Sequence, residues 1–241
     1  MARRPARKSA RPARPARRAA ATGPAAPTSD REKIVAALLA LLAESPFEEI
    51  GLADIAAEAG VSLAQLRGEF PGKLGILAAH MKATDRAVLA EDFSDMAEEL
   101  PRERLFDVLM RRLELLAPQR EAVRSLLRSA RRDPPLAFAL NALSVRSQQW
   151  MLAAAGINAS GPRGIINAQG LAWLFASVLR TWINDEDSGL SRTMAALDRA
   201  LARGQRFGGF LDDLCFIPSE LCRLRGRRRR RYEESEESAA A

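Results

Sequence analysis

One short segment constrains the fold of this chain more than any other. Residues 55–62 read IAAEAGVS, and residues 70–73 read FPGK. The apolar positions of the first motif share one helix face, Gly60 tolerates the positive φ that ends a helix, and Ser62 can cap the next helix. We therefore predict a helix-turn-helix, the unit whose second helix enters the major groove of DNA.

This segment resembles the N-terminal signature of the TetR family of transcriptional regulators, in which an IAxxAGVS helix precedes a short recognition helix and FPxK opens a long fourth helix. The resemblance covers about residues 31–80. It implies helices at Asp30–Glu44, Leu52–Ala59 and Leu63–Glu69, and a fourth helix that begins at Lys73. It also implies an all-α protein whose helical C-terminal body binds an effector and forms a homodimer.

The expected DNA contacts come from the recognition helix and the residues beside it. Gln65 is the best candidate for reading a base, because its amide can pair with adenine at two positions. Arg67 stands where the family usually has a phosphate-binding Tyr, and its guanidinium can bind phosphate as well. The complete predicted set is Arg31, Ser62, Leu63, Gln65, Arg67 and Lys73.

Charge is distributed unevenly along the chain. The formal net charge is +7, but residues 1–27 hold eight Lys or Arg and no acid, and residues 223–241 hold seven Arg and four Glu. The two tails thus carry +8 and +3, which leaves −4 for residues 28–222. Residues 30–77 alone hold eight acids and four bases, and Glu69 would be repelled by phosphate. Because affinity for DNA comes largely from neutralised phosphates, the predicted reading head needs its few bases at the groove or charge from a tail.

The N-terminal tail is the obvious source of that charge. Its Arg-Pro-Ala-Arg repeats favour an extended, disordered arm that can follow a minor groove or a phosphate ridge. A solubilising tail with nonspecific affinity for polyanions is the alternative. The repeated prolines argue against the amphipathic helix of a mitochondrial transit peptide.

The rest of the chain is predicted to be helical, with about nine helices in all, because no segment alternates apolar and polar residues as a strand does. Prolines divide it into expected helices at 101–116, 118–132, 134–155, 163–184 and 190–206. We expect four segments: a disordered basic arm (1–27), a helix-turn-helix DNA-binding domain (28–77), a helical effector-binding and dimerisation domain (78–210), and a C-terminal segment with an Arg-rich then acidic disordered tail (211–241).

The sequence lacks the patterns of an enzyme. It has no phosphate loop, dinucleotide fingerprint or metal-binding histidine motif, so no cofactor or metal is predicted. His80 is the only histidine and is expected to pack between helices, while Cys215 and Cys222 are expected to act as small apolar residues. With no secretory signal and no apolar stretch long enough to span a membrane, the chain is predicted to be cytoplasmic and associated with the nucleoid.

Apolar residues recur at helical spacing in the C-terminal body. Such stripes most often form plain core, but helices near 105–115 and 138–151 that do not fill the space between them would line a pocket for a small lipophilic effector. The candidate pocket residues are Phe106, Met110, Phe138, Trp150, Met151 and Trp173.

The segment from Gly170 to Ile183 is apolar around most of its circumference, so every side of it must be covered. A partner subunit is the expected cover, and a central core helix of a monomer is the alternative. A homodimer would read a palindromic operator with one head on each half-site. The predicted interface residues are Leu174, Val178, Trp182, Leu197 and Leu201.

A second resemblance lies near the C-terminus. Residues 182–199 read WINDEDSGLSRTMAALDR and are similar to the final helices of ubiquinone-biosynthesis lipid-binding proteins that share the TetR fold. This implies an alternative function, a lipid-binding protein of quinone metabolism that does not read DNA. An acidic head suits such a carrier, whereas the intact AGVS turn and FPGK favour a dimeric, ligand-responsive repressor.

Overall fold

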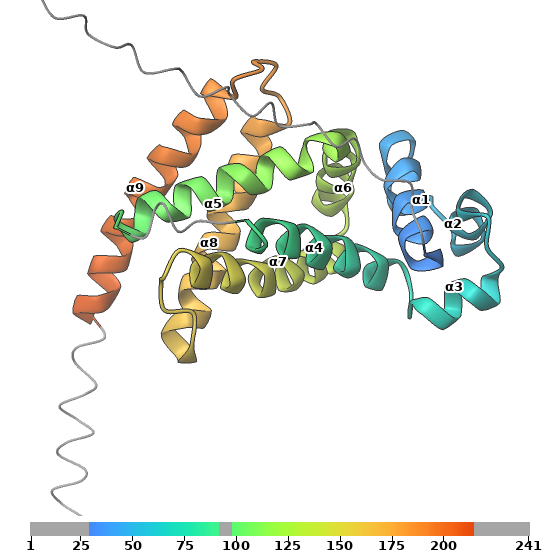
Figure 1. Cartoon of the computed structure of the whole chain (residues 1–241), viewed down its shortest axis with the longest axis horizontal. Coiled ribbons are helices and arrows are strands. Elements are labelled where there is room, and N and C mark those ends of the chain that lie inside the picture. The colour runs from blue at the N-terminus through green and yellow to red at the C-terminus, as the bar shows by residue number, and fades with distance from the viewer. Residues whose placement is uncertain (1–28, 92–97, 215–241) are drawn as a thin grey trace, which may run out of the picture.

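The structure, a computed structural model, describes residues 29–91 and 98–214, with the backbone alone for residues 205–214. Within these residues the chain forms helices and turns and no strand, so the predicted all-α class, with about nine helices, is confirmed. A small head of three helices lies at one end of the molecule, and the remaining helices form the body (Figure 1). The elements are α1 (Asp30–Glu44), α2 (Leu52–Ala59), α3 (Leu63–Glu69), α4 (Lys73–Leu89), α5 (Pro101–Leu116), the 3-10 turn η2 (Ala117–Gln119), α6 (Arg120–Arg132), α7 (Pro134–Ala154), α8 (Gly161–Trp182) and α9 (Ser191–Leu214).

The head helices have the bounds that the motifs predict, because their end signals are strong. Ser29 caps α1 in a reciprocal capping box with Glu32. Gly60 ends α2 in the left-handed region, with φ of 65°, and Ser62 caps α3. In the body, α9 continues past its predicted end at residue 206, since the backbone at Gly208 and Gly209 stays helical despite the low helix propensity of glycine.

Buried apolar residues form two clusters. One holds the head together and extends to Ala122 of α6 and Leu136 of α7, and the other is the core of the body. Helix α4 belongs to both, because Leu77 lies in the head cluster and Val88 in the body cluster. None of the described helices has an apolar stretch long enough to cross a membrane. Cys215 and Cys222 lie outside the described residues, as do both charged tails.

The loop between α1 and α2 is fastened to two helices. The ammonium of Lys73, at the start of α4, donates to the carbonyl oxygens of Phe47 and Ile50, both at 2.7 Å. From α6, the Ser129 hydroxyl accepts from the Phe47 amide at 3.1 Å, and the Ser125 hydroxyl donates to the Ser45 carbonyl at 3.0 Å. These bonds provide hydrogen-bond partners for backbone amide and carbonyl groups of the loop, which have no partners within a helix.

A buried ion pair joins α4 to the body. Arg112 of α5 donates to the Asp85 carboxylate of α4 at 2.7 Å, and both side chains are at most one-tenth exposed. Ser147 of α7 donates to the same carboxylate oxygen at 2.7 Å and contacts Arg112 as well. Side chains from α4, α5 and α7 therefore meet at the buried carboxylate of Asp85.

The segment that resembles the lipid-binding proteins has a clear structural role here. Asp185, which is buried, accepts from the amide and the hydroxyl of Thr193 at 2.8 and 2.7 Å and so fixes the first turn of α9. Asp187 accepts from the amides of Gly189 and Ser191 at 3.1 and 3.3 Å. These contacts form a tight connection between α8 and α9, and they account for the acidic and hydroxyl positions of the motif without a ligand.

The ion pair gives a stability prediction. Asp85→Asn leaves the Arg112 charge buried and unpaired, so we expect the free energy of unfolding in urea to fall by about 3–5 kcal/mol. Glu114→Gln is the matched control, because it removes an exposed pairing with Arg111 and should cost at most about 1 kcal/mol. Equal, small losses in both variants would contradict the role of Asp85.

Candidate nucleic-acid interface and ligand cavity

The recognition helix α3 presents a small exposed face. Leu66 is buried beneath it, whereas Leu63 is 54% exposed and Arg67 also lies on the outside. Ala64 and Gly68 complete this face, so it is nearly flat and carries one charge. A flat face lets the helix backbone come close to a groove.

Gln65, the predicted base reader, is occupied at both ends of its amide. Its oxygen accepts from the Ser62 amide at 2.8 Å, while its own backbone amide donates to the Ser62 hydroxyl at 3.1 Å. Its nitrogen donates to the Asp30 carboxylate at 3.2 Å. Ser62 and Gln65 thus build the start of the helix, and Gln65 has to exchange these partners before it reads a base.

Arg31 is held by an acid of the recognition helix. Its guanidinium donates to the carbonyl and the carboxylate of Glu69 at 3.1 and 3.3 Å, and lies 4.3 Å from the centre of the Phe70 ring. Both members of the ion pair are about half exposed, so the pair contributes at most about 1 kcal/mol. A phosphate can therefore replace Glu69 as the partner of Arg31 at little cost.

Most basic groups of the head are already engaged. Lys33 pairs with Asp30 at 2.9 Å, and Lys73 holds the loop carbonyls described above. Among the described head residues, Arg67 is the one base that makes no hydrogen bond or ion pair. All six predicted DNA contacts thus lie in or beside the helix-turn-helix, but only Leu63 and Arg67 are both exposed and unengaged.

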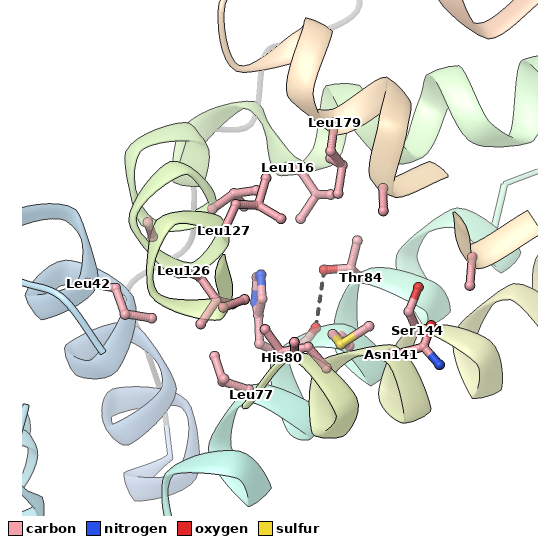
Figure 2. Close-up of a pocket in the computed structure, with 18 of the residues that line it drawn as sticks. Leu42, Leu77, His80, Thr84, Leu116, Leu126, Leu127, Asn141, Ser144 and Leu179 are labelled. Atoms are coloured by element: carbon pink, nitrogen blue, oxygen red, sulfur yellow. Dashed lines mark hydrogen bonds between the residues drawn. The ribbon is translucent and has the colours of Figure 1, made fainter. Parts of the chain in front are cut away.

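A cavity of about 450 Å³ lies between α4, α6, α7 and α8, within the size range of roughly 300–1,000 Å³ that small-molecule sites occupy. Figure 2 shows leucines around it, with His80 and Thr84 of α4 and Asn141 and Ser144 of α7 on the side that faces Leu116 and Leu179. Leu39 and Leu42 of α1 reach its wall, so the head itself borders the cavity. Other apolar wall residues are Leu77, Met81, Leu116, Val123, Leu126, Leu127, Leu140 and Leu179.

Only one of the six predicted pocket residues, Trp173, lines this cavity. Phe138 and Trp150 do not line the cavity and are 77% and 60% exposed on the outside of α7. Helical spacing identifies an apolar stripe but not the element that covers it, and here several stripes lie elsewhere. The other three predicted residues pack in or against the core of the body: Phe106, Met110 and Met151.

Sequence reasoning missed the polar wall of the cavity. His80, predicted only to pack between helices, lines the cavity, and its Nε2 atom is buried without a hydrogen-bond partner among the described residues. Burial lowers the pKa of His80, and the nearby Arg112 charge lowers it further, against an opposite effect of Asp85. His80 is therefore neutral at pH 7. The available signal was a single histidine on the helix that leads from the head to the body.

The structure places most of the predicted dimer-interface residues in the interior of one chain rather than on its surface. Val178 and Trp182 of α8, and Leu197 and Leu201 of α9, are at most 5% exposed within one chain and belong to the core of the body. Leu174 is only partly buried against that core. The reason is that α9 packs on α8 and covers this side, as the alternative of a core helix anticipates.

Another face of α8 is open. Ile166, Gly170, Trp173 and Ser177 recur at helical spacing and are all exposed, with Trp173 at 72%. Gly170 and Ser177 are small, so another helix can approach this stripe closely. We call these four residues the α8 stripe.

Comparison with known proteins gives the fold. No family model and no curated protein matches the chain by sequence. Among solved structures, it is similar to a TetR transcriptional regulator from Nitrosomonas europaea, with 25% identity and a TM-score of 0.57 over 73% of this chain and 98% of that one. It is also similar to a TetR transcriptional regulator from Rhodococcus sp. RHA1, with 22% identity and a TM-score of 0.52 over 72% and 94%.

The neutral His80 gives a prediction for stability against pH. The unfolded chain binds a proton at His80 near the ordinary pKa of about 6.5, whereas burial lowers the pKa of His80 in the folded chain, so the free energy of unfolding should fall as the pH falls below that value. We expect a loss of up to about 1.4 kcal/mol between pH 7.5 and 5.5, measured by urea unfolding. Because His80 is the only histidine, His80→Leu should remove this dependence, and an unchanged dependence would show that another group causes it.

Proposed function

We propose that this chain, which has the fold of the TetR-family transcriptional regulators, is a regulator that binds double-stranded DNA and responds to a small lipophilic ligand. One observation carries this proposal. The cavity is walled by α4 and α6, and these are the two helices that hold the loop between α1 and α2 of the head. A ligand that spreads this wall moves the attachment points of the head.

The coupling runs through adjacent residues. Ser125 and Ser129, which bind the head loop, alternate along α6 with Leu126 and Ala130, which line the cavity. On α4, Lys73 binds the same loop one turn before Leu77 enters the cavity wall. Packed interiors respond to a bound molecule by discrete shifts of whole helices. A shift of α4 against α6 therefore tilts α3 relative to the body.

For DNA binding we propose the residues selected from the sequence, in three groups. Arg67 and Leu63 face outward and meet the groove directly. Arg31 and Gln65 act after they exchange their acidic partners for phosphate and base. Ser62 and Lys73 act mainly by holding the recognition helix and its loop in place, and the basic arm of residues 1–27 adds phosphate contacts.

We further propose a homodimer that places two heads on the half-sites of a palindromic operator, in the cytoplasm and on the nucleoid. The α8 stripe replaces the buried residues as the interface, since it is an exposed stripe of α8 that carries apolar and small residues. Trp173 and Ile166 supply apolar area, and Gly170 lets a second helix come close. Repression follows if ligand-free heads match the half-site spacing and liganded heads do not.

Two substitutions on α3 test DNA binding with opposite signs. Arg67→Ala should weaken binding to every duplex and lower the salt slope by about one for each head. Glu69→Gln should strengthen binding and steepen the slope, because it removes a repelling charge and frees Arg31. Fluorescence anisotropy with a labelled duplex measures both. If Glu69→Gln leaves affinity and slope unchanged while the protein stays folded, α3 does not face phosphate.

The dimer gives a separate prediction. Trp173→Arg places a charge at the centre of the α8 stripe, so sedimentation should detect monomers at protomer concentrations where the unmodified chain is dimeric. Trp150→Arg is the matched control, because it makes the same change at an exposed tryptophan of α7 outside the stripe. A dimer that survives Trp173→Arg but not Trp150→Arg would move the interface to α7.

A further inference from the structure

The polar groups of the cavity are not spread evenly. Most of the wall is leucine and alanine. Among its polar residues, Thr84 and Asn141 already hydrogen-bond within the protein and Ser144 is half-buried on α7, whereas His80 and Arg112 lie near each other where α4 meets α5. Arg131 and Arg180 also border the cavity, but both are exposed and stay in contact with water. A wall that is mostly apolar, with unused hydrogen-bonding capacity at His80 and Arg112, fits a ligand that is apolar except at one end.

His80 has hydrogen-bonding capacity that the protein does not use. Its Nε2 atom is buried and has no partner among the described residues. Figure 2 shows the ring projecting between Leu77, Leu126 and Leu127 into the cavity, and the Thr84 hydroxyl donates to the backbone carbonyl of His80 rather than to its ring. A buried imidazole nitrogen without a partner is destabilising, and a ligand oxygen that hydrogen-bonds to it would remove this cost.

Arg112 has unused capacity as well, but its charge is already balanced. One guanidinium nitrogen donates to Asp85 and contacts Ser147, whereas the buried Nε atom has no partner in the described structure. The pair of Arg112 and Asp85 is neutral overall. The place therefore offers hydrogen bonds without a net positive charge.

We propose that the cavity binds an uncharged lipophile that carries one oxygen, of the alcohol, phenol or ring-carbonyl class, and that this oxygen hydrogen-bonds to His80 on the wall it shares with Arg112. The inference specifies the ligand of the regulator proposed above and rests on that proposal for its biological meaning. The apolar part of the ligand lies along the leucines of α6 and reaches Leu39 and Leu42 of the head.

A carboxylate is disfavoured at this place for an electrostatic reason. It would bring a second negative charge beside Asp85, and a balancing proton on His80 would have to be taken up against the burial that lowers its pKa. A buried ion without its own counter-ion is strongly destabilised, whereas a neutral oxygen needs only a donor. A carboxylate that binds at all would pair with Arg131 or Arg180, which are exposed to water at the border of the cavity rather than buried among its leucines.

Titration calorimetry on the full chain without DNA tests this with a matched pair of probes, 1-decanol and decanoate. We expect 1-decanol to bind more tightly than decanoate, and His80→Leu to weaken 1-decanol about tenfold, which corresponds to one lost hydrogen bond. His80→Leu should also raise the melting temperature of the ligand-free protein, because it removes a buried unpartnered atom. Met194→Leu, an apolar exchange at an exposed position of α9 that does not line the cavity, should leave the affinity for 1-decanol within twofold.

Three results would overturn the inference: tighter binding of decanoate, unchanged affinity of His80→Leu for 1-decanol, or no binding of either probe. A lower melting temperature of ligand-free His80→Leu would assign the histidine a purely structural role. Duplex binding measured without ligand tests the proposed regulator independently of the proposed ligand class. Failure of the unmodified chain to bind any duplex contradicts the regulator, while the calorimetry still decides the ligand class.

Discussion

The attachment of the loop between α1 and α2 couples the position of the head to helices α4 and α6 of the body. Lys73 holds two of its carbonyl oxygens from α4, and Ser129 holds the Phe47 amide from α6. A charged group bound to two carbonyls contributes more than a neutral hydrogen bond, so this attachment is firm. Because α4 and α6 also wall the cavity, the position of the head and the shape of the cavity cannot change independently.

The net negative charge of the head lowers its affinity for DNA, so the head would need additional basic contacts to bind. Its acids outnumber its bases, and Asp30 and Glu69 occupy Gln65 and Arg31. These exposed contacts are weak enough for DNA to displace, but they lower the affinity of a single head. Two heads joined by the α8 stripe, and the basic arm, would restore it. A regulator whose affinity depends on two weak heads is sensitive to small changes in their separation.

The sequence predicted the helices of both the head and the body, but not which face of each body helix is covered. Gly60 and Ser62 are local signals that act on their own neighbours, so α1, α2 and α3 have their predicted bounds. Trp182 of α8 and Leu197 of α9 are buried where these two helices pack on each other, whereas Trp173 of α8 is exposed. Which face is covered depends on tertiary packing and does not follow from helical spacing. No sequence motif identifies His80 as a functional residue. Its significance depends on Leu126 and Arg112, which come from other helices and meet it only in the folded chain.

The measurement that tests the central claim most directly is selection of bound duplexes from a random DNA pool at about 0.15 M salt, with the full chain and with a chain that lacks residues 1–27. The account predicts that both recover one palindrome, and that removal of the arm lowers affinity without changing the sequence. Recovery of no motif, with all binding lost on removal of the arm, would contradict a DNA-reading head. That result would favour a lipid-binding protein in which the cavity functions without DNA.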